Sequence, residues 1–341
     1  MIRALMIVLV SVALACCATL PCAAGHDKEI ALTFDDVPRE PGAFMTMAER
    51  QTRLIAALKL AHVRRVAFFT NPGRLDRAKS PDYPEPIMAY ANAGHIIANH
   101  SFTHSALSEV SVQAYLEDVD RADTWLRGRK NFRPWYRFPY LDEGGDDVTK
   151  RDAVRAALKA RGLFDAAITV DGWDWNMEDR AVEAVRTGKV IDRAALKDMF
   201  VTAYVDEAEC ADALARKLLG RAPAQVMLLH EADVTTMFLG DLVKNLRAHG
   251  WKIVSPDTSY RDPIYRIKTK KPPAEGPLLT ELARDRGIDT RLPAAGTMTH
   301  LPIRNSTGAC CIGLRELSAE KWLVCPNFHP IGIFGALFAL P

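Results

Sequence analysis

The chain has 341 residues, 48% apolar and 25% charged, which suits one large globular domain or two modest ones. Its 44 Lys and Arg nearly balance 42 Asp and Glu, so a formal charge of +2 gives no electrostatic reason to expect a nucleic-acid partner. The sequence also has no basic tract with interleaved aromatic residues.

The N-terminus has the pattern of a secretory signal peptide. Arg3 precedes an apolar run over residues 4–20, and small residues follow at 23–25. We expect cleavage after Ala24 and export to the periplasm or the cell exterior. A membrane anchor and a lipoprotein acylation site are alternatives, although Pro21 opposes a continued spanning helix, so we expect no stable membrane span after the signal is removed.

Four of the seven cysteines lie beyond the predicted signal peptide, namely Cys210, Cys310, Cys311 and Cys325. The sequence contains no C-x-x-C pair, so we do not expect a zinc site made of thiolates. Export would permit a disulfide, but the sequence does not select a pair.

Short apolar runs alternate with longer amphipathic stretches between residues 29 and 263. The apolar runs predict strands over residues 30–34, 66–69, 95–98, 166–170, 226–229 and 251–254. Helical spacing predicts helices over residues 47–61, 84–93, 112–127, 150–161, 181–220 (in two or three pieces) and 236–248. This alternation indicates an α/β fold with a largely parallel sheet of six or seven strands.

Acids or histidines follow four of the predicted strands, just after Phe34, Ala98, Val170 and Leu229. In parallel β/α folds the carboxyl ends of the strands meet at one edge, where active sites form. Because four strand ends carry such residues, the sequence favours an enzyme with one shared site.

Two histidines and two acids suggest a metal site. His100 and His104 are four residues apart, and on a helical turn this spacing would place both imidazoles within reach of one ion. Asp35 and Asp36 are adjacent after an apolar strand. Their like charges repel each other, and a bound cation would offset this repulsion. Two imidazoles and one carboxylate make a hydrolytic zinc site with open positions. The same residues are also compatible with surface histidines and an exposed turn before Pro38.

Five short motifs follow one another along the chain: Thr33-Phe34-Asp35-Asp36, His100-Ser101-Phe102-Thr103-His104, Arg137-Phe138-Pro139-Tyr140, Asp171-Gly172-Trp173-Asp174-Trp175 and Leu228-Leu229-His230. In these motifs and their order the chain resembles the polysaccharide deacetylase (NodB-homology) family, carbohydrate esterase family four. The resemblance implies a distorted (β/α) barrel of seven or eight strands. It also implies removal of N-acetyl, or less readily O-acetyl, groups from an acetylated oligo- or polysaccharide.

The resemblance further implies which residues bind. Asp36, His100 and His104 would hold one divalent metal ion, with zinc the expected one. Tyr140, Trp175 and Leu228 would bind the substrate, and Trp175 and Leu228 would shape the pocket for the acetyl methyl group.

Five residues would carry the chemistry in a member of this family. Asp35 would be the base that deprotonates water, and Arg137 would orient it. His230 would be the general acid, tuned by Asp174. The backbone N–H of Tyr140 would stabilise the oxyanion.

The chain departs from the family pattern at two places. Val37-Pro38 stands where the family has Gly-Pro, and Leu141-Asp142-Glu143 follow the third motif where the family has an immediate Gly. We expect the first to change the shape of the loop, and the two acids to alter the substrate or to meet a cationic sugar.

These patterns divide the chain into a signal peptide (1–24), a catalytic domain (25–264) and a C-terminal extension of unknown role (265–341) with a short helix over 278–287. Two other functions stay open. One is a carbohydrate-binding protein with an inactive cleft, and the other is a metal-dependent amidase that acts on a non-sugar amide.

Overall fold

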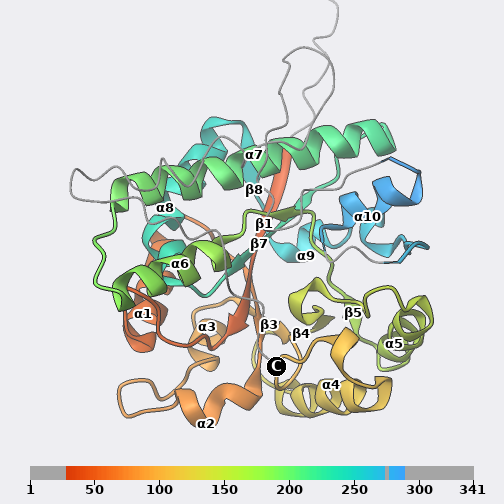
Figure 1. Ribbon diagram of the computed structural model, residues 1–341, viewed down its shortest axis with the longest axis horizontal. Helices are drawn as coiled ribbons and strands as arrows, with labels where there is room; N and C mark the ends of the chain where they lie inside the picture. Colours follow the sequence, from red (N-terminus) through yellow and green to blue (C-terminus); the bar gives the residue numbers. More distant parts are fainter. Residues whose placement is uncertain (1–27, 273–275, 289–341) are drawn as a thin grey trace, which may run out of the picture.

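A parallel sheet of eight strands lies at the centre of the protein (Figure 1). The structure, a computed structural model, describes residues 28–272 and 276–288. The predicted signal peptide, three of the four remaining cysteines and most of the C-terminal extension lie outside these residues. The strands are β1 (Lys28–Val37), β2 (Ala67–Thr70), β3 (Ile96–Asn99), β4 (Phe132–Tyr136), β5 (Phe164–Asp165), β6 (Val170–Asp171), β7 (Gln225–His230) and β8 (Trp251–Ile253).

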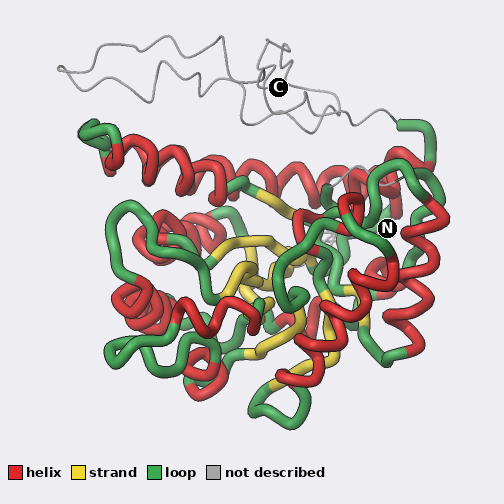
Figure 2. Tube along the Cα trace, turned by 60° about the horizontal axis from the view of Figure 1, so that its bottom comes forward, coloured by secondary structure: helices red, strands yellow, loops and turns green. Residues whose placement is uncertain are grey.

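Helices surround this sheet, as Figure 2 shows with strands in the middle and helices around them. The α-helices are α1 (Met47–Leu60), α2 (Leu75–Ala78), α3 (Met88–Asn92), α4 (Val112–Leu126), α5 (Val148–Ala160), α6 (Asp174–Arg186), α7 (Arg193–Leu219), α8 (Asp233–Ala248), α9 (Pro256–Ser259) and α10 (Leu278–Asp285). Short 3-10 turns are η1 (Pro72–Arg74), η2 (Leu107–Glu109), η3 (Pro139–Leu141) and η4 (Pro263–Arg266). None of the helices in the described ranges is long and apolar enough to cross a membrane.

The sheet is curled because its two ends are joined by a very short piece of chain. The strand order is β5-β4-β3-β2-β1-β7-β6, with β8 paired to β1, and every pair is parallel. A flat sheet would separate β5 and β6 by about 29 Å, at about 4.8 Å per strand. The link, residues 166–169, spans at most about 18 Å from Asp165 to Val170. The predicted distorted (β/α) barrel is therefore confirmed.

Several predicted elements are wrong in extent. The apolar run at 166–170 is mostly this link, and only Val170–Asp171 forms a strand, because a buried link needs apolar residues as much as a buried strand does. β4 and β5 were not predicted, since β4 contains Arg133 and Pro134 and β5 is very short. The helix predicted from residue 181 begins at Asp174 instead.

The extension contributes to the same core as the barrel. The predicted short helix is present as α10, whose Leu279, Leu282 and Ala283 are buried in the main hydrophobic cluster. The backbone N–H of Leu278 donates to the carbonyl of Ile168 in the link, at 2.8 Å. The boundary after residue 264 stays a prediction, but residues 276–288 pack on the barrel.

Candidate functional site

The carboxyl ends of β1 and β7 place an acid and a histidine side by side. In the parallel register of these strands, Asp35 is the partner of His230, and Thr33 is the partner of Leu228. Because side chains alternate along a strand, Leu228 and His230 share one face of β7. The expectation that acids and histidines gather at one edge of the sheet agrees with this register.

Asp36, His100 and His104 form a cluster whose ligand atoms all lie within 4.8 Å of one another. His104 Nε2 is 3.0 Å from Asp36 Oδ1 and 3.2 Å from His100 Nε2. His100 Nδ1 donates to the carbonyl of Arg137 at 2.9 Å, which directs Nε2 of the same ring toward the cluster. Burial, and then the charge of His104, lowers the pKa of His100 well below its ordinary value, so this ring is neutral and fit to bind a metal.

The two histidines do not lie on a helical turn, so that prediction is wrong. Ser101 has φ 65° and His104 has φ 68°, values that no α-helix contains. Side-chain acceptors hold the loop instead: Asp118 accepts the N–H groups of residues 102 and 103 at 2.9 Å, and Asn99 accepts that of Ser101 at 2.8 Å. Such side chains compete with the helix for backbone N–H groups.

Asp35 lies beside this cluster and is held by an arginine. It is 2% exposed, and Arg137 Nη1 donates to both carboxylate oxygens, at 3.0 and 3.2 Å. Burial raises the pKa of Asp35, while the guanidinium limits the rise. Arg137 is itself fixed, since Nε donates to the carbonyl of Ala166 at 2.7 Å and Nη2 to the hydroxyl of Tyr260 at 2.9 Å.

His230 is bound twice by the carboxylate of Asp174. Its Nδ1 lies 2.7 Å from Oδ1, and its backbone N–H donates to Oδ2 at 2.7 Å. Burial lowers the pKa of His230, but Asp174 more than offsets this and raises the pKa to about 9. The imidazole is therefore protonated near neutral pH, as an acid must be.

The three residues predicted to line the substrate pocket lie around these groups. The ring of Tyr140 is stacked edge-on against His104, with centroids 4.4 Å apart, and its backbone has φ 59°. Trp175 is in the first turn of α6 beside Asp174 and is 37% exposed. Leu228 is buried on the face of β7 that carries His230.

Two arginines that contact Asp36 were not predicted from the sequence. Arg39 Nη1 donates to Oδ2 at 3.0 Å, and Arg74 Nη1 donates to Oδ1 at 3.3 Å. Burial would raise the pKa of Asp36, but His104 and Arg74 hold it well below the ordinary range. Arg39 three residues after the acid pair was the only available signal, and neither arginine belongs to a motif.

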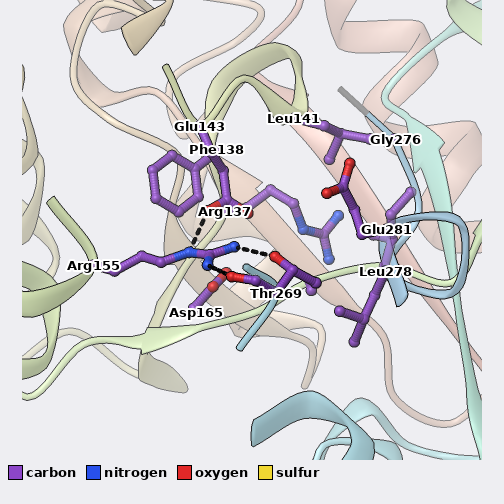
Figure 3. A pocket seen from close by; sticks show the side chains of 12 residues that line it. Arg137, Phe138, Leu141, Glu143, Arg155, Asp165, Thr269, Gly276, Leu278 and Glu281 are labelled. Atoms are coloured by element: carbon purple, nitrogen blue, oxygen red, sulfur yellow. Dashed lines mark hydrogen bonds and ion pairs between the residues drawn. The ribbon is translucent and has the colours of Figure 1, made fainter. Parts of the chain in front are cut away.

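The two acids after the third motif are used inside the protein, which corrects the expectation that they meet the substrate. Asp142 accepts the backbone N–H groups of Ser108 and Gly144 at 2.7 Å. Glu143 pairs with Arg155 at 2.5 Å, and both line a cavity of about 30 Å³ that Arg137 also lines (Figure 3). Burial and the nearby Asp165 raise the pKa of Glu143 to about 7. Both acids therefore stabilise the loop rather than face the metal cluster.

A parallel barrel with a His-His-Asp cluster beside a buried carboxylate, at the sheet edge that also carries an imidazole, defines a class of protein with a candidate divalent-metal centre. Residues 23–161 match the family model described as polysaccharide deacetylase, and this segment of the chain is similar to that family. The match contains the first three motifs, whereas the fourth and fifth lie beyond it.

Relatives of known name are similar to parts of the chain. Peptidoglycan-N-acetylmuramic acid deacetylase of Bacillus subtilis is 26% identical over 57% of this chain and 36% of its own length. Peptidoglycan-N-acetylglucosamine deacetylase of Bacillus cereus is 26% identical over 34% of this chain and 37% of its own. The chain thus spans little more than a third of the curated relatives it matches. A family 4 carbohydrate esterase from Streptomyces lividans, solved with acetate, superposes with TM-score 0.44 at 23% identity, over 68% of this chain and 96% of its own.

Proposed function

We propose that this protein is a metal-dependent hydrolase that removes N-acetyl groups from an exported glycan. The observation that carries the proposal is the arrangement at one sheet edge, where the cluster of Asp36, His100 and His104 adjoins Asp35 and the sheet register pairs Asp35 with His230. The family match and the names of the relatives support deacetylation as the reaction.

One divalent ion would be held by Asp36, His100 and His104. Zinc suits this donor set best, because two imidazole nitrogens and one carboxylate leave positions open for water and substrate. When bound, the ion would polarise the acetamido carbonyl and lower the pKa of a bound water.

Asp35 would accept the proton of the attacking water. Its carboxylate lies 3.8 Å from His100 Nε2, next to the cluster, and Arg137 fixes its direction. A base held this way is oriented before substrate arrives, which is where much of its effect arises. The N–H of Tyr140 would donate to the tetrahedral oxyanion, a contact worth about 3 kcal/mol in comparable enzymes.

His230 would protonate the leaving amine, because an amine is a poor leaving group until it gains a proton. The Asp174 carboxylate keeps the imidazole charged near neutral pH and accepts from Nδ1, which leaves Nε2 to donate. Trp175 and Leu228 would border the acetyl methyl group, so their apolar surface favours acetyl over charged acyl groups.

The test is acetate release by purified protein that is first stripped of metal and then reloaded with zinc. A panel of chitooligosaccharide, peptidoglycan strands and acetylated xylan separates N-acetyl from O-acetyl substrates, with Asp35→Asn and His230→Ala as the inactive controls. Acetate from no acetylated sugar, with normal metal binding, would sink the proposal. Sugar binding without turnover would favour the carbohydrate-binding alternative, and release only from non-sugar amides would favour the amidase.

A further inference from the structure

Arg39 and Arg74 bracket the carboxylate of Asp36 from two different segments. Arg39 follows β1, and Arg74 ends η1 after β2. Their side chains are 18% and 19% exposed, so both guanidiniums lie at the rim of the site rather than in the core. Their charges reach the groups on both sides: Arg39 acts to lower the pKa of His230, and Arg74 acts to lower that of Tyr140.

A buried network fixes the position of Arg39. Its backbone N–H donates to Glu231 at 2.9 Å, and its carbonyl accepts from Arg50, which is fully buried and pairs with Asp233 at 3.2 Å. The loop also passes so close to this network that a Cβ on Gly42 would lie 2.4 Å from the Asp233 carboxylate. The loop therefore holds Arg39 in one place.

Arg74 is fixed against the histidine loop. Its backbone N–H donates to Asn71 at 3.0 Å, and the N–H of Gly73 donates to the carbonyl of Phe102 at 3.0 Å. A Cβ on Gly73 would lie 2.4 Å from that carbonyl, so η1 packs directly on the segment between the two histidines. Arg74 thus keeps its place relative to the metal ligands.

The charges at the Asp36 end of the site do not balance. Arg137 already pairs with Asp35, and His230 pairs with Asp174. Two guanidiniums face the carboxylate of Asp36, and among the described residues Asp179, 3.3 Å from Arg39, is the only other acid that forms an ion pair with either of them. Because the side chain of Asp179 is 61% exposed, solvent screens its charge. At this end of the site two guanidiniums therefore share one shielded carboxylate, which the proposed metal ion would also bind.

The remaining donors suit a carboxylate. Within the described residues Arg74 donates only through Nη1, so Nε and Nη2 remain available to a ligand. A guanidinium is planar and binds carboxylates through two parallel hydrogen bonds, which a lysine cannot do.

We propose that Arg39 and Arg74 form an anion subsite, and that the glycan taken by this protein carries a carboxylate close to the acetamido group. This inference rests on the proposed function and names its substrate class as an acidic N-acetylated sugar. The arginines are specificity determinants, because they bind a substituent that does not react.

The experiment compares kcat/KM on a neutral chitooligosaccharide and on an N-acetylated oligosaccharide whose neighbouring residues carry carboxylates. For Arg39→Gln and Arg74→Gln we expect kcat/KM on the acidic substrate to fall about tenfold or more relative to kcat/KM on the neutral one. Arg39→Lys should recover part of the loss, and added salt should weaken only the acidic substrate. The matched control is Arg77→Gln, whose side chain is 73% exposed and 4.0 Å from Glu40.

Metal content is measured for each variant, so that a lost ion is not mistaken for a lost subsite. Equal losses on both substrates, or a wild-type preference for the neutral glycan, would overturn the inference while leaving the deacetylase proposal intact. A further outcome is that acetate inhibits the wild type but not the variants, while the variants still treat the two substrates alike. That result would mean that the arginines bind the acetate product rather than a carboxylate of the glycan, and it would also overturn the inference.

A binding measurement separates the two proposals. The acidic oligosaccharide is titrated calorimetrically into zinc-loaded protein and into both variants. If no glycan releases acetate, binding that weakens about tenfold in the variants still supports the anion subsite, although the proposed function fails. Binding that is equally tight in wild type and variants overturns the subsite whether or not the protein is active.

Discussion

At the scale of single residues, we predict that the pair of His230 and Asp174 sets the alkaline limit of activity. The charged groups around the imidazole are Asp174 on α6, Asp35 and Asp36 on β1, Asp171 on β6 and Arg39 in the following loop. Four of these groups are acids and one is an arginine. Together with burial they give His230 a pKa of about 9. An acid catalyst works while it is protonated, so activity should persist up to about pH 9 and fall above it.

Replacing Asp174 should move this limit downward. In Asp174→Asn the His230 imidazole loses its main anionic partner but stays buried, so its pKa should fall by about two units or more. The alkaline limb of the kcat/KM profile should then move down to about pH 6.5 or lower. The pH–rate profile between pH 5 and 10 measures this. The control is Asp198→Asn on the exposed face of α7, which should leave the profile unchanged. An unmoved limb in Asp174→Asn would show that another group titrates.

The metal ligands can be tested without any assay of activity. Zinc that binds only the folded state stabilises it by about 2.7 kcal/mol when the zinc concentration is about a hundred times Kd. This stabilisation appears as a rise in melting temperature. We expect this rise in the wild type and in His249→Ala, whose histidine caps α8 far from the site in sequence. His104→Ala should show little or no rise, because one of three ligand atoms is gone. A full rise in His104→Ala would place the ion elsewhere.

The residues of the site were predictable where one motif places one side chain at a strand end. Asp35, His100 and His230 follow apolar strands, and parallel strands bring their ends together whatever the details of the loops. Arg39 and Arg74 were not predictable, because the path of each segment depends on contacts that are distant in sequence: Glu231 and Arg50 for Arg39, and Phe102 for the segment of Arg74. The geometry of the histidine loop was missed for the same reason.

At the scale of elements, the turn from β6 to α6 depends on one glycine. Gly172 lies between Asp171 and Trp173, and a Cβ there would be 2.6 Å from the ring of Tyr204 on α7. Gly172→Ala must push α7 away from the turn that presents Asp174. We expect a loss of stability of about 1–3 kcal/mol and a lower kcat.

A second glycine provides the control for this change. Gly240 lies inside α8, and a Cβ there would meet nothing within 4 Å. Gly240→Ala should therefore stabilise the protein, by about 0.5–1 kcal/mol, because alanine favours helix. Denaturant unfolding of both variants is the measurement, and equal effects of the two substitutions would contradict the close contact at Tyr204.

Elements with strong periodicity were predicted best. The apolar runs of β1, β2, β3 and β7 and the helix α4 agree with the structure within a few residues. β4 escaped prediction because Arg133 and Pro134 interrupt its apolar pattern, and Arg133 pairs with Asp257 at 2.9 Å. The place of β4 in the sheet is set by its pairing with the neighbouring strands, and this pairing cannot be read from the local sequence.

At the scale of the whole molecule, α10 covers the junction between β5 and β6. Leu279 is 1% exposed in the main core, although it lies outside the predicted catalytic domain. Leu279→Ala should cost about 2–4 kcal/mol of unfolding free energy, as buried leucines generally do. Leu60→Ala, at a side chain 79% exposed, should cost close to nothing. Equal stability of the two variants would mean that the extension packs only weakly on the barrel.

The link over residues 166–169 has a consequence for how the protein loses activity. The carbonyl of Ala166, which belongs to the segment that closes the barrel, also receives the hydrogen bond from Nε of Arg137. The arginine that would orient the proposed base is thus attached to the junction where the barrel is joined by chain rather than by strand pairing. We expect heat to open this junction before the rest of the sheet separates, so that Asp35 loses the support of Arg137 first. We expect thermal inactivation to begin below the temperature of global unfolding, and the lifetime of the junction to set the lifetime of the active form.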